Sequence, residues 1–365
     1  MNKFFDSLPI RWKIILTVII PMILSVYFSV DYIISSNNEA KQLNVISELS
    51  KLAVKSSELV HELQKERGRT AGFLNSKGSK FSSEIVSQRE ETNIFLNNFN
   101  NAIQNEEIAI TKSSLTEELS KINQFLLQLD NIRSSIDNFS ISTENALKYY
   151  TQTIGSLINI VDKIADESKV NSEISKLIYG YKSYLELKER NGILRATMTA
   201  VFAKNMFTPF LYSRAIEINA EMNVFYNDFV KKAKKEILEF ESNKMNAPEV
   251  EQTSQYYNFA IKNHDSTNLG ISPDLWFSTI TKKIDKMKEV EDKIAETILS
   301  TATEYSEEAI GNRNFLIIFL IIIMFITVFL ILLITKRISK RLALATEMAH
   351  RISIGDLTYL SKLKM

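Results

Sequence analysis

Apolar residues recur every three to four positions through most of the chain, and this spacing is typical of amphipathic helices. Five such stripes can be followed: Val45, Leu49, Leu52, Leu59, Leu63 and Leu74; Phe81, Ile85, Thr92, Phe95 and Phe99; Leu115, Leu119, Ile122, Leu126, Leu129, Ile132 and Ile136; Leu147, Tyr150, Ile154, Leu157 and Val161; Ile174, Leu177, Tyr181 and Leu185. The alternation of period two that marks strands is missing from the sequence. The pattern therefore predicts an all-α protein.

Capping residues and prolines predict where helices begin. Ser142 or Thr143 is expected to cap the fourth helix, and Asn171 or Ser172 the fifth. Proline suits the first position of a helix, and three prolines stand where a new helix could begin: Pro209, Pro248 and Pro273. Eight or so helices in up-down order predict paired antiparallel four-helix bundles that share long helices.

Two segments are apolar enough to cross a membrane. Phe315 to Ile334 is twenty residues long without a charge, and at 1.5 Å per residue it spans about 30 Å, the thickness of the bilayer core. Residues 14–34 form a weaker apolar run that contains Pro21 and Asp31. A cleaved signal peptide is the alternative here. We expect an uncleaved anchor, because the run is long for a signal core and no small-x-small cleavage site follows it.

Basic residues flank both apolar segments: Lys3, Arg11, Lys13, Lys336, Arg337, Lys340 and Arg341. By the positive-inside bias, both termini are expected to be cytoplasmic. The expected organisation is a cytoplasmic N-terminus (1–13), a first transmembrane helix (14–34), an extracytoplasmic helical sensor (35–314), a second transmembrane helix (315–334) and a cytoplasmic linker (335–365).

Composition limits the chemistry that the chain can perform. Its net charge is +1, it has no cysteine, and its three histidines are scattered. No basic stripe favours a nucleic-acid partner, and disulfides, thiolate chemistry and a metal-ligand cluster are not expected. The sequence offers no nucleophile–base set and no phosphate loop. We therefore expect neither an enzyme activity nor a cofactor.

Glycines gather in one helical segment. Gly68, Gly72 and Gly78 fall within eleven residues of a chain that has only nine glycines, although each costs about 1 kcal/mol relative to alanine inside a helix. A turn at residues 75–78 explains Gly78 alone. The other two glycines would let a ligand approach the backbone closely.

The same segment carries an inward arginine. With Leu59 at zero and 100° per residue, Arg67 falls at about 80°, inside the apolar stripe that also holds Thr70. Arg69 falls at about 280°, on the far side.

The helix beginning near residue 172 repeats this geometry. With Leu177 at zero, Arg195 lies at about 0°, Lys188 near 20° and Gly192 at about 60°. Arg190, at about 220°, points away.

A guanidinium in an apolar interior is costly unless something pairs with it. One explanation is a buried salt bridge, with Glu66, Glu189 or Glu217 as the partner. The other is that Arg67 and Arg195 leave a gap for a small anion, because the planar guanidinium suits a planar oxyanion. Spacing alone leaves both open.

The segments LQKERGRTAGFL, SKGSKF, QREET, KERNGILRATMTAVF and SPDLWFSTITKKID resemble the nitrate- and nitrite-sensing (NIT) domain of bacterial transmembrane chemoreceptors and related regulators. The resemblance covers about Glu48 to Ala302. It implies paired four-helix bundles and nitrate or nitrite as ligand. It also implies that Arg67 and Arg195 bind the ligand, with Gly68, Thr70, Gly72, Lys188 and Gly192 in support. Leu194-Arg195-Ala196 departs from the family's common Glu-Arg-Ala, so a neighbouring carboxylate is missing.

The cytoplasmic segment has a heptad seam: Ile338, Leu342, Ala345, Ala349 and Ile352. This spacing is typical of parallel coiled coils, and the segment TKRISKRLALATEMAHRISIGDLT resembles the first helix of a HAMP linker. Arg341 stands where that family often has proline, and a generic juxtamembrane amphipathic helix is the alternative. Gly355-Asp356-Leu357 closes the seam. Because few residues follow, we expect the chain to be truncated or stunted before any output domain.

Together these features predict a homodimeric receptor in the bacterial inner membrane, of the methyl-accepting chemotaxis type. It would sense nitrate or nitrite outside the membrane, relay the signal through the HAMP-like helix, and reach cytoplasmic signalling proteins through an output domain that could also be a cyclase or a kinase. The alternative is a ligandless module that dimerises or senses a partner protein. That alternative predicts carboxylates on both arginines and no cavity between their helices.

Overall fold

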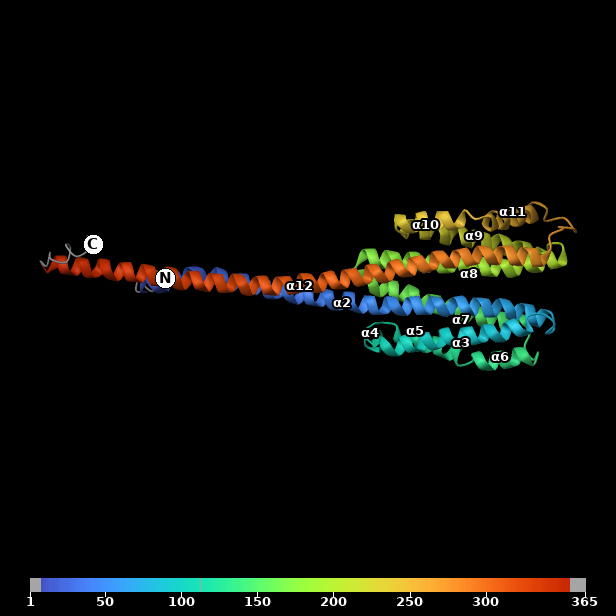
Figure 1. Ribbon diagram of the computed structural model, residues 1–365, viewed down its shortest axis with the longest axis horizontal. Helices are drawn as coiled ribbons and strands as arrows, with labels where there is room; N and C mark the ends of the chain where they lie inside the picture. Colours follow the sequence, from blue (N-terminus) through green and yellow to red (C-terminus); the bar gives the residue numbers. More distant parts are fainter. Residues whose placement is uncertain (1–7, 112, 355–365) are drawn as a thin grey trace. The chain divides into compact units, whose positions relative to one another are not determined.

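The computed structural model describes residues 8–111 and 113–354 of the chain (Figure 1). Eleven α-helices and one short 3-10 helix occur in this part, and it contains no strand. The prediction of an all-α protein is confirmed. The chain divides into two compact units, one of residues 42–306 and one of residues 1–41 with 307–365.

Two long helices, α2 (Ile10–Asn75) and α12 (Pro273–Ser353), contain the two apolar segments. Helix α2 continues without a break from its apolar run into the unit of residues 42–306, as its stripe predicts. Pro21 lies inside α2 without ending it.

Most helix starts lie where the sequence places them. Ser142 caps α7 (Thr143–Glu167) by accepting a hydrogen bond from the backbone N–H of Asn145. Asn171 caps α8 (Ser172–Lys204) in the same way. The three prolines are the first residues of α9 (Pro209–Lys232), α11 (Pro248–Lys262) and α12.

The third predicted helix is wrong in one respect, because the stripe from Leu115 to Ile136 is broken. The structure has α5 (Thr116–Leu126) and α6 (Leu129–Asp137) in its place. The Tyr149 hydroxyl donates a 2.7 Å hydrogen bond to the carbonyl oxygen of Phe125. The same oxygen accepts a 3.0 Å bond from the backbone N–H of Gln128. The chain therefore turns with a three-residue span at this point, and a side chain that enters the ladder interrupts an α-helix.

The second stripe forms α3 (Ser82–Asn105), in which Ile85, Thr92 and Phe99 are buried. Phe81 lies outside this helix and precedes it. Three short helices have no counterpart in the predicted set: α4 (Glu107–Thr111), the 3-10 helix η1 (Ser168–Val170) and α10 (Lys235–Met245).

Side-chain contacts connect α2, α7, α8 and α12 in the unit of residues 42–306. The Ser56 hydroxyl on α2 donates to the Leu157 carbonyl on α7, at 2.9 Å. The Trp276 indole on α12 donates to the Arg195 carbonyl on α8, at 3.0 Å. Figure 1 shows α3, α5 and α6 along one side of these helices and α9, α10 and α11 along the other.

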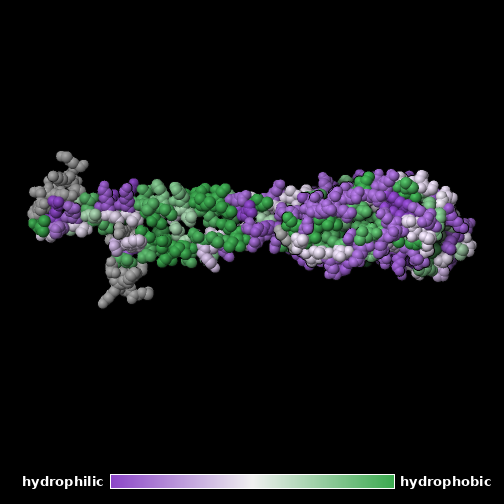
Figure 2. Space-filling view, turned by 90° about the horizontal axis from the view of Figure 1, so that it is seen from below, coloured by the Kyte–Doolittle hydropathy of each residue, from purple (hydrophilic) through white to green (hydrophobic). Residues whose placement is uncertain are grey.

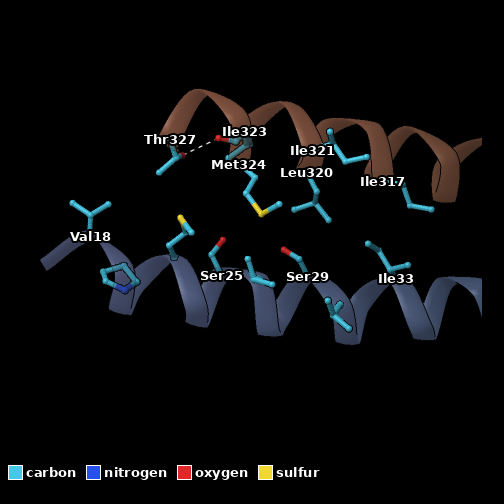
Figure 3. A pocket seen from close by; sticks show the side chains of 14 residues that line it. Val18, Ser25, Ser29, Ile33, Ile317, Leu320, Ile321, Ile323, Met324 and Thr327 are labelled. Carbon is cyan, nitrogen blue, oxygen red and sulfur yellow. Dashed lines mark hydrogen bonds between the residues drawn. The ribbon is translucent and has the colours of Figure 1, made fainter. Parts of the chain in front are cut away.

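The second unit contains the apolar segments of α2 and α12. Both helices are long and apolar enough to cross a membrane, by length and composition alone. Large apolar side chains are exposed here, with Tyr27 66% and Phe325 73% accessible, and Figure 2 shows them as an apolar belt on this unit. A groove of about 420 Å³ separates the two segments, and the hydroxyls of Ser25 and Ser29 point toward α12 in it (Figure 3).

Candidate functional site

Helices α2 and α8 face each other through a reciprocal pair of arginines and glycines. A Cβ atom on Gly192 would lie 3.1 Å from Nη2 of Arg67, and a Cβ atom on Gly68 would lie 3.1 Å from Nη2 of Arg195. Each arginine therefore lies against the glycine of the opposite helix. Both side chains are buried, with 7% and 9% of their surface exposed. The predicted inward orientation of the two arginines is confirmed.

Arg67 has a carboxylate partner, Glu189. Its Nη1 and Nη2 contact the two carboxylate oxygens of Glu189 at 2.5 and 2.9 Å, and Nη1 also donates to the Thr151 hydroxyl at 3.0 Å. The Gln64 amide donates a further bond of 2.8 Å to Glu189. Such a fork-to-fork pair neutralises the guanidinium. For Arg67 the salt-bridge explanation therefore describes the structure.

The other two proposed carboxylate partners are engaged elsewhere. Glu66 accepts two 2.8 Å bonds from Arg133 of α6 and one of 2.7 Å from the Tyr150 hydroxyl. Glu217 pairs with Arg214, three residues before it, at 3.2 Å. Neither glutamate contacts Arg67 or Arg195.

Arg195 has no carboxylate within 4.0 Å among the described residues. Its Nη1 donates to the Thr281 hydroxyl at 2.9 Å, and its Cζ lies 4.8 Å from the centroid of the Phe277 ring. Burial, with the charge of Arg67 as a second cause, lowers the pKa of Arg195 to about 10. The group therefore remains a cation at neutral pH without a counterion.

A cavity of about 350 Å³ opens beside this arginine. It is lined by residues from α2, α8 and α12 and by one residue that precedes α3: His61, Lys65, Gly68, Arg69, Phe81, Arg195, Phe277, Thr281 and Asp285. Arg67 is not among them. The two predicted ligand arginines thus lie on facing helices, but only Arg195 reaches this cavity.

The predicted orientation of Arg69 is wrong, because this residue lines the cavity instead of pointing away from it. Its guanidinium donates to the side-chain oxygen of Gln88 on α3, and it has no carboxylate within 4.0 Å in the part of the chain that is described. The helical-wheel argument assumed a single buried face for α2. Helix α3 covers a second face, so Arg69 is half-buried.

Cations outnumber anions around the cavity. Lys65 is paired with Glu62 at 2.7 Å, which leaves Arg69 and Arg195 against the single carboxylate of Asp285. Burial raises the pKa of Asp285, although Arg195 and lysines nearby oppose this effect. Burial, followed by the charges of surrounding lysines and Arg195, lowers the pKa of His61 well below 6.5, so its imidazole is neutral. The cavity therefore favours an anionic occupant.

Gly72 serves the packing of Phe81, not a ligand. A Cβ atom on Gly72 would lie 2.4 Å from two carbons of the Phe81 ring, so only glycine admits this ring against α2. Phe81 has a φ of 64°, which is strained for a bulky residue. Gly78, with a φ of 80°, occupies the turn after α2 as predicted.

Of the residues predicted to support the site, only Gly68 lines the cavity; Gly72, Gly192, Lys188 and Thr70 lie outside it. Lys188 is fully buried and pairs with Glu291 of α12. Thr70 is also fully buried but does not line the cavity. Arg190, predicted to point away, pairs with Glu221 of α9 and with Glu186, because α9 covers that face of α8.

Sequence reasoning missed most of the other lining residues. Phe277 and Thr281 lie in the segment SPDLWFSTITKKID, which was noted only for its resemblance, and His61 and Lys65 belong to α2. Their spacing, four residues apart on each helix, was a usable signal, since such residues share a helix face.

The described geometry is a buried, cation-rich cavity between helices. A family model described as nitrate and nitrite sensing matches residues 58–299. More than half of the chain is matched, and the chain belongs to the nitrate- and nitrite-sensing (NIT) domain family.

Two relatives illustrate the likeness. The nitrate regulatory protein of Klebsiella oxytoca is 24% identical over 265 residues, which are 72% of this chain and 66% of that protein. The NasR transcription antiterminator has a solved structure with a TM-score of 0.68 and 24% identity, and the match covers 78% of this chain and 77% of that one. The second likeness shows a shared helical fold.

Proposed function

We propose that this chain is a membrane-anchored receptor that binds nitrate or nitrite in the cavity beside Arg195. The observation that carries the proposal is a buried guanidinium without a carboxylate partner among the described residues, in a chain of the NIT family. A bound oxyanion would supply the missing negative charge through paired N–H bonds.

Within this proposal, Arg195 and Arg69 are the ligand cations. Thr281 can donate or accept a further hydrogen bond, and the absence of a side chain on Gly68 keeps the Arg195 guanidinium close to α2. Arg67 is a positioning residue, because Glu189 already neutralises it. It adds to the positive potential that acts on Arg195.

The ligandless alternative accounts for only part of this geometry. It predicted a carboxylate on each arginine and no cavity between the helices. The Arg67–Glu189 pair agrees with it. The unpaired Arg195 and the cavity of about 350 Å³ favour the binding function instead.

The proposed architecture supports signalling along α12. We propose two antiparallel four-helix bundles outside the membrane, one of α2, α3, α5–α6 and α7, the other of α8, α9, α10–α11 and α12. Thr281 and Asp285 line the cavity, and the same helix continues through the apolar segment. A ligand that prefers one packing of α12 would shift the equilibrium tenfold for about every 1.4 kcal/mol of preference.

The output is proposed from the cytoplasmic segment. The heptad seam lies on α12 and is uncovered in a single chain, with Leu342 38% and Ile352 50% exposed, which agrees with a parallel pairing of two copies through a HAMP-like linker. Residues 355–357, expected to close the seam, lie outside the described part. A role in chemotaxis, signalling partners in the cytoplasm and the lack of a nucleic-acid partner stay predictions.

Binding is tested by calorimetry on the full chain in detergent, with nitrate and nitrite as titrants. Arg195→Met and Arg69→Met are expected to lose the binding heat. Arg214→Met is the matched control, because this arginine is partly exposed and pairs only with neighbouring Glu217, and it should bind as the wild type does. Absence of heat with the wild-type chain would leave the ligandless module as the better description.

Membrane orientation is tested separately with single cysteines, since the chain has none of its own. A membrane-impermeant maleimide should label Asn138→Cys from outside intact spheroplasts. It should label Lys340→Cys only after permeabilisation. The opposite pattern would overturn the proposed topology.

A further inference from the structure

A second cavity, of about 320 Å³, lies between α8, α9, α10, α11 and α12. On α12 it is lined by Lys283 and Met287, whereas Thr281 and Asp285 line the oxyanion cavity. Residues two positions apart on a helix are separated by about 200°. The two cavities therefore lie on opposite faces of α12, and the second plays no part in the oxyanion site.

Two buried polar atoms in this cavity lack hydrogen-bond partners. Asn191 donates through Nδ2 to the Leu187 carbonyl at 2.9 Å, which fixes the amide and leaves Oδ1 without a donor. The Tyr184 hydroxyl also has no partner. The two residues are 1% and 0% exposed. An unsatisfied buried polar group costs about 1–3 kcal/mol, so a hydrogen bond from a bound molecule to either atom would be stabilising.

The cavity also holds one cation and one anion that do not pair with each other. No carboxylate of the described residues lies within 4.0 Å of the Lys283 ammonium, and no basic group of that part lies within 4.0 Å of Glu241. Burial alone lowers the pKa of Lys283 to about 8. Burial also raises the pKa of Glu241, although Tyr226 opposes this effect. Each charge would be stabilised by a partner of opposite sign.

The rest of the lining is apolar and amide in character. Leucine, valine and methionine side chains from five helices form the apolar wall: Leu187, Met222, Met245, Val250 and Met287. Methionine adapts to irregular shapes. The volume lies near the lower end of the about 300–1,000 Å³ that is usual for small-molecule sites.

We propose that this cavity binds a small zwitterion of the α-amino acid class with an apolar side chain. The carboxylate of the ligand pairs with Lys283, and its ammonium group donates to Glu241 and to Oδ1 of Asn191. The apolar side chain of the ligand packs against the methionine-rich wall. A simple oxyanion fits this cavity less well, because Glu241 repels it and most of the volume stays empty.

The first test needs no variant. Thermal unfolding of the full chain in detergent is followed with L-leucine, 4-methylpentanoate and 3-methylbutylamine, which present both charges, only the carboxylate, or only the ammonium group. A ligand that binds only the folded state raises the melting temperature according to its concentration relative to Kd. We expect Kd for L-leucine to be at least tenfold lower than for either analogue. Equal binding of the carboxylate analogue, or no shift with any zwitterion, overturns the proposal.

The second test uses matched pairs of variants. Lys283→Met and Glu241→Gln should each raise Kd for L-leucine at least tenfold. The controls Lys282→Met and Glu239→Gln change exposed neighbours of the same types and should leave it unaltered. Nitrate binding should persist in all four variants, which separates this site from the oxyanion site. Loss of L-leucine binding in the controls as well, or its retention in Lys283→Met, contradicts the proposal.

Discussion

The same substitution is expected to destabilise the chain at Arg67 and to leave its stability nearly unchanged at Arg195. Arg67→Met leaves Glu189 buried with only the Gln64 amide as a hydrogen-bond donor among its present partners. Removing one member of a buried ion pair costs about 3–5 kcal/mol of the free energy of unfolding. Arg67→Met should therefore destabilise the chain by about this amount.

Arg195→Met removes a buried charge that forms no ion pair with residues 8–111 or 113–354. Burial and the charge of Arg67 lower the pKa of Arg195 to about 10, which corresponds to a penalty of about 3 kcal/mol for the charged form. The substitution relieves this penalty but loses the hydrogen bond to Thr281, of about 2 kcal/mol, and the contact with the Phe277 ring, of about 1 kcal/mol. The expected change in the free energy of unfolding is close to zero.

Both changes in the free energy of unfolding are measured by denaturing the chain in detergent with guanidinium chloride. Trp276 is fully buried and its indole donates to the Arg195 carbonyl, so its fluorescence reports on the site. Trp12→Phe provides the background that isolates this signal. Nitrate at about 100 times its Kd should stabilise the wild-type background by about 2.7 kcal/mol and Arg195→Met not at all.

The decisive comparison is between the two variants. If Arg195→Met destabilises the chain as strongly as Arg67→Met does, Arg195 has a buried anionic partner and the reasoning is refuted. A double variant, Arg67→Met with Glu189→Leu, serves as control. It should recover most of the loss, because well-packed apolar residues can replace a buried ion pair.

Two further predictions concern packing and pH. Gly72→Ala should destabilise the chain by about 1–3 kcal/mol, because its Cβ would overlap the Phe81 ring. The control Gly155→Ala, which has nothing within 4 Å of its added Cβ, should stabilise the chain by up to about 1 kcal/mol. Equal effects of the two substitutions in thermal unfolding would show that Phe81 moves freely. The pKa of His61 is lowered in the folded chain, so the unfolded chain takes up a proton first and stability is lost as pH falls below about 6.5. His61→Gln should weaken the dependence of the melting temperature on pH between pH 8 and 5.5, whereas His264→Gln, at an exposed position, should leave it unchanged. The same pH dependence in His61→Gln as in the wild type would contradict the expected neutral imidazole.

Local signals predicted the helices well and their interruptions poorly. Asn171 and the three helix-starting prolines act on their own backbone, so their effect is visible in sequence. At the break between α5 and α6, the Tyr149 hydroxyl of α7 reaches the Phe125 carbonyl. No feature of the broken segment itself indicates this contact.

The sequence by itself determined the all-α fold, the two long apolar segments and the inward orientation of Arg67 and Arg195, because helical periodicity fixes which side chains share a face. Only the tertiary structure decided which arginine is neutralised. Glu189 pairs with Arg67, Glu66 with Arg133, and Arg195 with no carboxylate of the described part. It also brought Arg69 into the cavity, since α3 covers a second face of α2. The physical reason is that the pairing of buried charges depends on how neighbouring helices are placed against one another, and a periodicity within one helix carries no information about that placement.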